Sequence, residues 1–137
     1  MDFKEKDKFI VCVMQDGEDL IENLKILKEN FKNYKILTVL SALGMLKDVK
    51  TGYWNGKEYE IHEINEPVEL LGISGIITPE TDPFYHFHIF VGDRKGNVKG
   101  GHLIEAKVLN TLEMFLIKGD IEVKREEEKG LKKLKIV

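Results

Sequence analysis

Hydrophobic residues recur along the chain with either helical or strand spacing, which predicts one helix and a series of strands. Residues 8–14 alternate between apolar and polar types and include β-branched side chains, which predicts a strand. Residues 16–19 supply an acidic N-cap and first turn, so a helix should begin there and extend to about Asn30 or Asn33. The core face of this helix is marked by apolar residues at helical spacing, namely Leu20, Ile21, Leu24, Leu27 and Phe31.

The rest of the chain has the pattern of strands. Residues 36–47 predict a strand bent at Gly44, and residues 50–61 predict a hairpin that turns on Asn55-Gly56. Residues 67–78 fit either two strands or one long bent strand, with Gly72 and Gly75 as candidate bulges. The remaining segments are a hairpin around residue 95, a long strand over 107–117, a strand over 121–125 and a possible short strand near the C-terminus. The expected fold is α+β, with one helix packed on an antiparallel, strongly curved sheet.

Three histidines form the most informative cluster of the sequence. His86 and His88 lie two residues apart in an aromatic, β-branched run, so their side chains should share one face of a strand. A hairpin centred near Lys95 would place His88 directly opposite His102. Three neutral imidazoles with an open position are typical of a catalytic zinc site. The alternative is ordinary packing or surface histidines, and a bulge at Gly100-Gly101 would turn His102 to the other face.

Length and composition are those of a single domain over residues 1–137, with 126–137 as a loosely attached tail. The net charge of −3 gives no general attraction to nucleic acid or anionic membrane, and the only arginines are Arg94 and Arg125. The charged N-terminal segment is not a signal peptide, and the apolar run over 36–46 is too short to span a bilayer. We therefore expect a cytoplasmic protein with no membrane partner.

The order of residues around the histidines resembles the PPC (plant and prokaryote conserved) domain. The matching residues are Pro83, His86-Phe-His88, Gly96 and Gly100-Gly-His102-Leu. The resemblance implies a mixed α+β fold, a homotrimer, and a fold similar to that of acetolactate decarboxylase, a metalloenzyme whose metal is held by a His-x-His pair and a later histidine. It also implies that His86, His88 and His102 take the ligand positions and that Glu113 is the best candidate for a nearby carboxylate in the family pattern.

The family is commonly described as DNA-binding, so the first hypothesis is a DNA-binding or regulatory homotrimer. Its candidate contacts are lysines spaced to lie along one helix face if the helix reaches that far, namely Lys25, Lys28, Lys32 and Lys35. Acidic residues interleave with these lysines, which is more typical of a solvated face. The chain has no Arg-Gly-Arg-Pro-like AT-hook, and few arginines are available to read bases, so any DNA binding should be weak and non-specific.

Two other hypotheses use the histidines. A divalent metal, most simply Zn²⁺, could serve a lyase or hydrolase, with Glu113 as fourth ligand or general acid/base. Alternatively, the metal is structural within a homotrimer, and aromatic residues near position 55 lie at a subunit interface or in the core.

Overall fold

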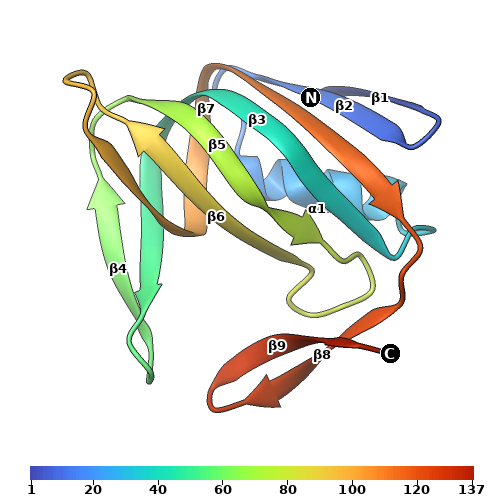
Figure 1. The fold of residues 1–137 in the computed structure, drawn as a ribbon. Helices are drawn as coiled ribbons and strands as arrows, with labels where there is room; N and C mark the ends of the chain where they lie inside the picture. The colour runs from blue at the N-terminus through green and yellow to red at the C-terminus, as the bar shows by residue number, and fades with distance from the viewer.

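The computed structural model describes residues 1–137 as nine strands and one helix (Figure 1). The N-terminal elements are β1 (Asp2–Lys6), β2 (Phe9–Gln15) and the helix α1 (Leu20–Asn30). The central strands are β3 (Ile36–Trp54), β4 (Tyr59–Ile64), β5 (Val68–Ile77), β6 (Tyr85–Gly92) and β7 (Val98–Gly119). A separate two-stranded sheet follows, made of β8 (Val123–Glu128) and β9 (Leu131–Ile136).

The main sheet has the strand order β1-β2-β7-β6-β5-β3-β4, and every pairing in it is antiparallel. β3 also pairs with β7, so β3, β5, β6 and β7 close into a ring. Several register shifts along the β3–β7 pair bend both strands. One of them lies at Gly44, where φ is +150° and a Cβ atom would collide with the carbonyl of Thr111, so only glycine fits. The expected bend at Gly44 is thus present.

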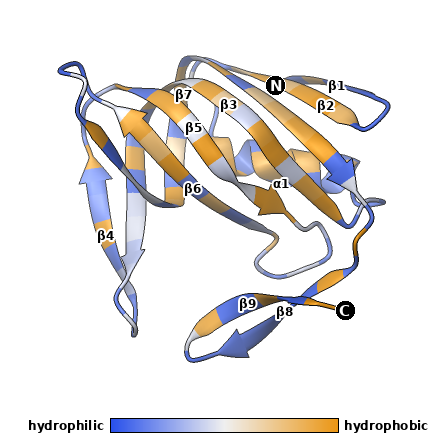
Figure 2. Ribbon diagram, in the orientation of Figure 1, coloured by the Kyte–Doolittle hydropathy of each residue, from blue (hydrophilic) through white to orange (hydrophobic).

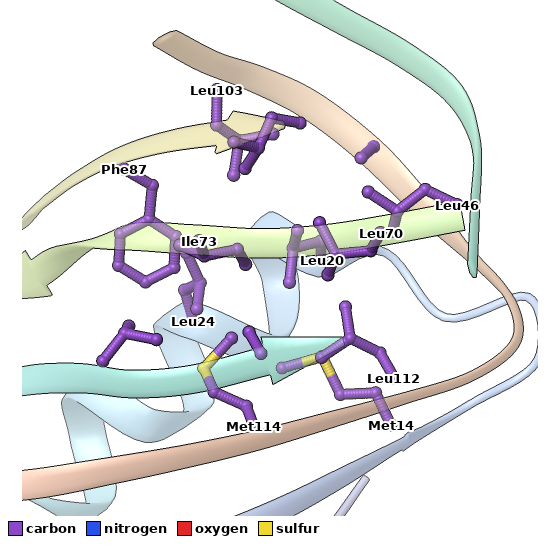
Figure 3. Packing of buried hydrophobic residues seen from close by; sticks show 14 of the residues in the cluster. Met14, Leu20, Leu24, Leu46, Leu70, Ile73, Phe87, Leu103, Leu112 and Met114 are labelled. Carbon is purple, nitrogen blue, oxygen red and sulfur yellow. The ribbon is translucent and has the colours of Figure 1, made fainter. Parts of the chain in front are cut away.

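The core lies between α1 and the inner face of the curved sheet. Asp19 caps α1 by accepting a hydrogen bond from the backbone N–H of Glu22. Leu20 and Leu24 of α1 are fully buried with methionines of β2 and β7 and with Phe87 of β6, and Figure 3 shows this packing. Figure 2 shows hydrophobic residues concentrated on the strands near α1, and mostly hydrophilic residues on β4 and β8. The α+β class predicted from the sequence is confirmed.

Four details differ from the sequence predictions. β1 was not expected, because its side chains are all exposed and carry no apolar periodicity. The strand with His102 and the strand over 107–117 are one continuous strand, β7, because both halves pair with the long β3. Gly75 has no bulge, although residues 67–78 do form the single strand that was one of the two predicted alternatives, β5, with a register shift between Leu70 and Gly72. Residues 123–136 pair with each other and add no strand to the main sheet.

No helix of the chain has both the length and the apolar character that crossing a membrane requires.

Candidate metal centre

The hairpin that carries the histidines has the strand register predicted from the sequence. Asp93 closes its turn, because Oδ1 accepts hydrogen bonds from the backbone N–H groups of Lys95 and Asn97, each at 2.9 Å. Gly96 within the turn has a φ of +81°, which glycine adopts without strain. The resulting register pairs His88 with His102, and Gly100 and Gly101 continue the pairing without a bulge. The predicted opposition of His88 and His102 is therefore confirmed.

The alternation of β6 decides which side of the sheet the histidines occupy. Phe87 and Ile89 point inward and are buried, so His86, His88 and Phe90 lie on the outer face, away from α1. His102 shares that face because it is the direct partner of His88. His86 and His88 are exposed, whereas His102 is partly buried. The three imidazoles therefore form one patch that solvent reaches.

The spacing of the ring nitrogens suits a single cation. One nitrogen from each histidine lies within 4.8 Å of the other two, and Nε2 of His86 is 3.1 Å from Nε2 of His88. Two imidazole nitrogens bound tetrahedrally at ~2.0–2.1 Å from zinc would be roughly 3.3–3.4 Å apart. The Nδ1 atom of His102 is buried and has no hydrogen-bond partner. The donor set and this unsatisfied polar atom fit a metal ion better than they fit simple packing.

Burial and electrostatics lower the pKa values of two of the imidazoles, those of His86 and His102. Burial is the main cause that lowers the pKa of His102 to about 4, and charge on His86 and His88 adds to the effect. Burial likewise lowers the pKa of His86, with smaller contributions from His88 and Arg125. Because a neutral imidazole offers a lone pair to a metal and an imidazolium does not, both residues are ready to coordinate at neutral pH.

Aromatic residues hold His102 in place from the side of β4. The ring of Tyr59 stacks on His102 with centroids 4.6 Å apart and an angle of 19° between the rings. Trp54 packs edge-on against Tyr59 at 5.2 Å. Gly52, the β3 residue paired with His102, leaves room for Tyr59, because a Cβ atom there would lie 2.8 Å from the tyrosine ring. Sequence reasoning identified these aromatics only as interface or core candidates, because their approach to His102 depends on the β3–β4 and β3–β7 pairings.

Glu113 lies on the same outer face but not in the cluster. It is far along β7 from His102, paired with Val13 of β2 and Leu43 of β3, and its side chain is exposed. Within one chain the structure groups only the three histidines as candidate ligands. The role of Glu113 as fourth ligand or acid/base therefore stays a prediction.

The four candidate nucleic-acid lysines do not form the expected row on one helix. α1 ends at Asn30, so Lys32 and Lys35 lie beyond it. Lys25 forms a salt bridge with Glu22 at 2.7 Å, and Lys35 forms one with Glu80 at 3.0 Å. The ammonium of Lys28 lies 5.0 Å from the centre of the Phe84 ring. Carboxylates thus offset part of the positive charge that phosphate binding would use.

Comparison with known proteins places the chain in a family. Residues 1–120 match the Plants and Prokaryotes Conserved (PCC) domain. The chain belongs to the PCC domain family. No curated protein matches the PCC chain.

Solved structures resemble the PCC chain over nearly its whole length. A plant- and prokaryote-conserved (PPC) protein of Pyrococcus horikoshii is 24% identical with a TM-score of 0.82, and the match covers 99% of this chain and 96% of that chain. The metal-containing protein AF0104 of Archaeoglobus fulgidus is 28% identical with a TM-score of 0.77, and 97% of each chain is covered. A protein of Bacteroides thetaiotaomicron, provisionally named a DNA-binding protein, is 17% identical with a TM-score of 0.88, and 98% of this chain and 96% of that chain are covered.

Proposed function

We propose that this PCC protein is a homotrimeric metalloprotein that binds one divalent cation per chain through His86, His88 and His102. The observation that carries the proposal is the convergence of three ring nitrogens within 4.8 Å on a face that solvent reaches. The pKa of His102, lowered to about 4, keeps that ligand free of competing protons at neutral pH. The similar protein from Archaeoglobus fulgidus is described as metal-containing, which adds support. Zn²⁺ is the first ion to test, because imidazole suits it well.

The arrangement favours a catalytic metal centre, of a lyase or a hydrolase, over a structural one. Structural zinc sites are almost always closed by four protein ligands, whereas catalytic sites have three and keep a position for water or substrate. One chain supplies three histidines here, and two of them are exposed. A bound cation would supply Lewis acidity toward an oxygen of a small substrate. Glu113 lies on the same exposed face but far from the histidines of its own chain. In a trimer, the Glu113 carboxylate of a neighbouring copy would be the one that reaches the site, as fourth ligand or general acid/base.

The outer face of the sheet supports the trimer. The register places Val11, Leu43, Phe90 and Phe115 on this face, each at least a third exposed. Leu40 and Leu71, at two strand irregularities, are also about half exposed. Soluble monomers rarely expose so many large apolar side chains on one face, and covering them with further copies removes that surface from water.

DNA binding is the second candidate function, and it rests on the names of relatives. Proteins of similar fold from Bacteroides thetaiotaomicron and Ralstonia eutropha are provisionally named DNA-binding proteins. In this chain the net charge is −3 and two of the four candidate lysines are paired with carboxylates. Binding to duplex DNA should therefore be weak, fall steeply between about 50 and 200 mM salt, and show no preference among sequences.

Native mass spectrometry with elemental analysis tests the metal site and the trimer together, on protein purified without a metal-affinity tag. We expect a trimer with one Zn, Fe or Mn per chain. His88→Ala should lose the metal and stay folded, because the His88 side chain is exposed. His62→Ala is the matched control, since His62 is also an exposed strand histidine but lies on β4, outside the cluster. Equal metal content in the two variants would refute the site.

A further inference from the structure

Two strands of the chain have an edge without a partner. β4 is the last strand of the main sheet and pairs only with β3, so the backbone groups along its outer edge are open. β9 pairs only with β8, so its other edge is open as well. Figure 1 shows β4 at one edge of the main sheet and the β8–β9 hairpin apart from that sheet. An isolated two-stranded hairpin is only marginally stable in water, so β9 would gain stability by joining a larger sheet.

The two open edges carry opposite charge. β4 contains two glutamates and no lysine or arginine, whereas β9 contains three lysines and no acidic residue. Within the chain these charges are only weakly used. Glu63 reaches Lys50 at 3.8 Å, and Lys132 forms no salt bridge. Both charges are therefore available to a strand from outside the chain.

In one antiparallel register the side chains of β4 and β9 match position by position. Apolar residues of β4 meet apolar residues of β9, and each glutamate meets a lysine. The opposed residues would be Tyr59 with Ile136, Glu60 with Lys135, Ile61 with Leu134, His62 with Lys133, Glu63 with Lys132 and Ile64 with Leu131. In the single chain Ile61 is 51% exposed and Leu134 is 38% exposed, so this pairing would remove apolar surface from water.

Charge disfavours the pairing of either edge with its own counterpart. Two antiparallel β4 strands in full register would set Glu60 opposite Glu63, and two β9 strands would set Lys132 opposite Lys135. Like charges directly opposite each other destabilise a sheet, so each edge favours the other. A contact between two different surfaces of one chain is heterologous, and such contacts close into rings. Three copies that each use both edges once fit the proposed homotrimer.

The hairpin of the same chain lies in a different place. A Cβ atom on Gly130, at the β8–β9 turn, would be 3.3 Å from the ring of Trp54, and Trp54 pairs with Tyr59 at the start of β4. The antiparallel register instead needs Leu131, the residue after Gly130, to lie opposite Ile64 at the other end of β4. The two ends of β4 are roughly 17 Å apart, at about 3.3 Å per residue. The strand that pairs with β4 must therefore come from a second copy.

We propose that β9 of one copy pairs with the open edge of β4 of the next copy and so joins three copies into a ring. This inference rests on the proposed homotrimer and names two strands that hold its copies together. Ile136 of the neighbouring copy then lies opposite Tyr59, whose ring stacks on His102. The neighbouring strand therefore also borders the three-histidine site.

Disulfide cross-linking of the full-length protein tests the pairing. The single native cysteine, Cys12, is buried and does not compete, because burial raises its pKa to about 12. After mild oxidation, Ile61→Cys/Leu134→Cys should run as a covalent trimer on a denaturing, non-reducing gel, and a mixture of the two single variants should give covalent dimers. The matched control is Ile61→Cys/Ile136→Cys, which moves the second cysteine two residues along the same face of β9. It should cross-link several-fold more slowly although Ile136 is 81% exposed, because a disulfide needs its two Cβ atoms closer than a diagonal pair brings them.

A charge exchange tests the same register without cysteines. Glu63→Lys would face Lys132 of the next copy, so it should raise the dissociation constant of each contact by about two- to fivefold. Glu63→Lys/Lys132→Glu should restore the wild-type value, because the two charges again have opposite signs. Native mass spectrometry on dilution measures both values. Failure of the double variant to recover assembly would contradict the register.

Native mass spectrometry of the reduced variants separates the pairing from the homotrimer. A trimer in which Ile61→Cys/Leu134→Cys cross-links no faster than the control pair would overturn the β4–β9 pairing and leave the homotrimer standing. Disulfides confined to single chains would also overturn it, since the hairpin would then pair with its own β4. A wild-type protein that is monomeric would overturn the homotrimer and the pairing that rests on it.

Discussion

Phe87 and Phe90 of β6 offer a paired test of the face assignment on which the metal site depends. Phe87 is fully buried, whereas Phe90 is 45% exposed and shares the outer face with His86 and His88. A buried phenylalanine removes roughly 150–250 Å² from water, worth about 4–6 kcal/mol at roughly 25 cal/mol per Å². Part of this surface remains buried with alanine, so Phe87→Ala should lower the free energy of unfolding by about 3–5 kcal/mol. Phe90 is about half as buried, so Phe90→Ala should cost each chain at most ~2 kcal/mol.

Urea unfolding followed by circular dichroism, at two protein concentrations, measures these losses, and native mass spectrometry follows assembly. Phe87→Ala should show the larger loss at both concentrations. Phe90→Ala should show a loss that depends on protein concentration, with trimers dissociating on dilution, because the outer face is where the copies would meet. Equal losses of intrinsic stability in the two variants would contradict the face assignment and with it the shared face of His86 and His88.

Three further predictions concern the site and the helix. In metal-free protein, the free energy of unfolding should fall by up to about 3 kcal/mol as pH drops from about 6.5 toward 4. The reason is that the unfolded chain then binds a proton at His102, whereas in the folded state the pKa of His102 is lowered to about 4. Urea unfolding measured against pH should show this slope, and His102→Ala should reduce it. Tyr59→Ala should weaken zinc binding by about tenfold in a chelator competition, because the ring that orients His102 is lost. Tyr53→Ala is the control and should leave zinc binding unchanged, because Tyr53 is 63% exposed. Asp19→Ala should lower the free energy of unfolding by about 0.5–2 kcal/mol through loss of the α1 cap, and a thermal melt that matches the wild type would contradict that role.

Local patterns predicted much of this fold because the interactions behind them are local. The spacing of Leu20, Leu24 and Leu27 identifies α1, since residues three and four apart share a helix face whatever the helix packs against. Asn55 likewise closes the β3–β4 turn with its own side chain, which accepts hydrogen bonds from the backbone N–H groups of residues 57 and 58. Elements of this kind need no information from distant parts of the chain.

Long-range pairings could not be predicted in this way. β7 continues past the histidine hairpin to Gly119 because β3 offers a partner along its whole length, and nothing in residues 103–106 signals that continuity. The same pairing sets Glu113 opposite Leu43, away from His102 of its own chain. Only the registers between strands far apart in sequence place these residues.

The sequence by itself determined that His88 faces His102 and that His86 lies beside them, because a short turn closed by Asp93 sets the register and strand alternation sets the face. The tertiary structure alone decided that this face is the exposed one and that Tyr59 stacks on His102. Those outcomes depend on the side of the sheet that α1 covers and on the pairing of β3 with β7. Both are set by packing between segments that are distant in the chain, and the hydrophobic periodicity of the sequence does not predict such packing.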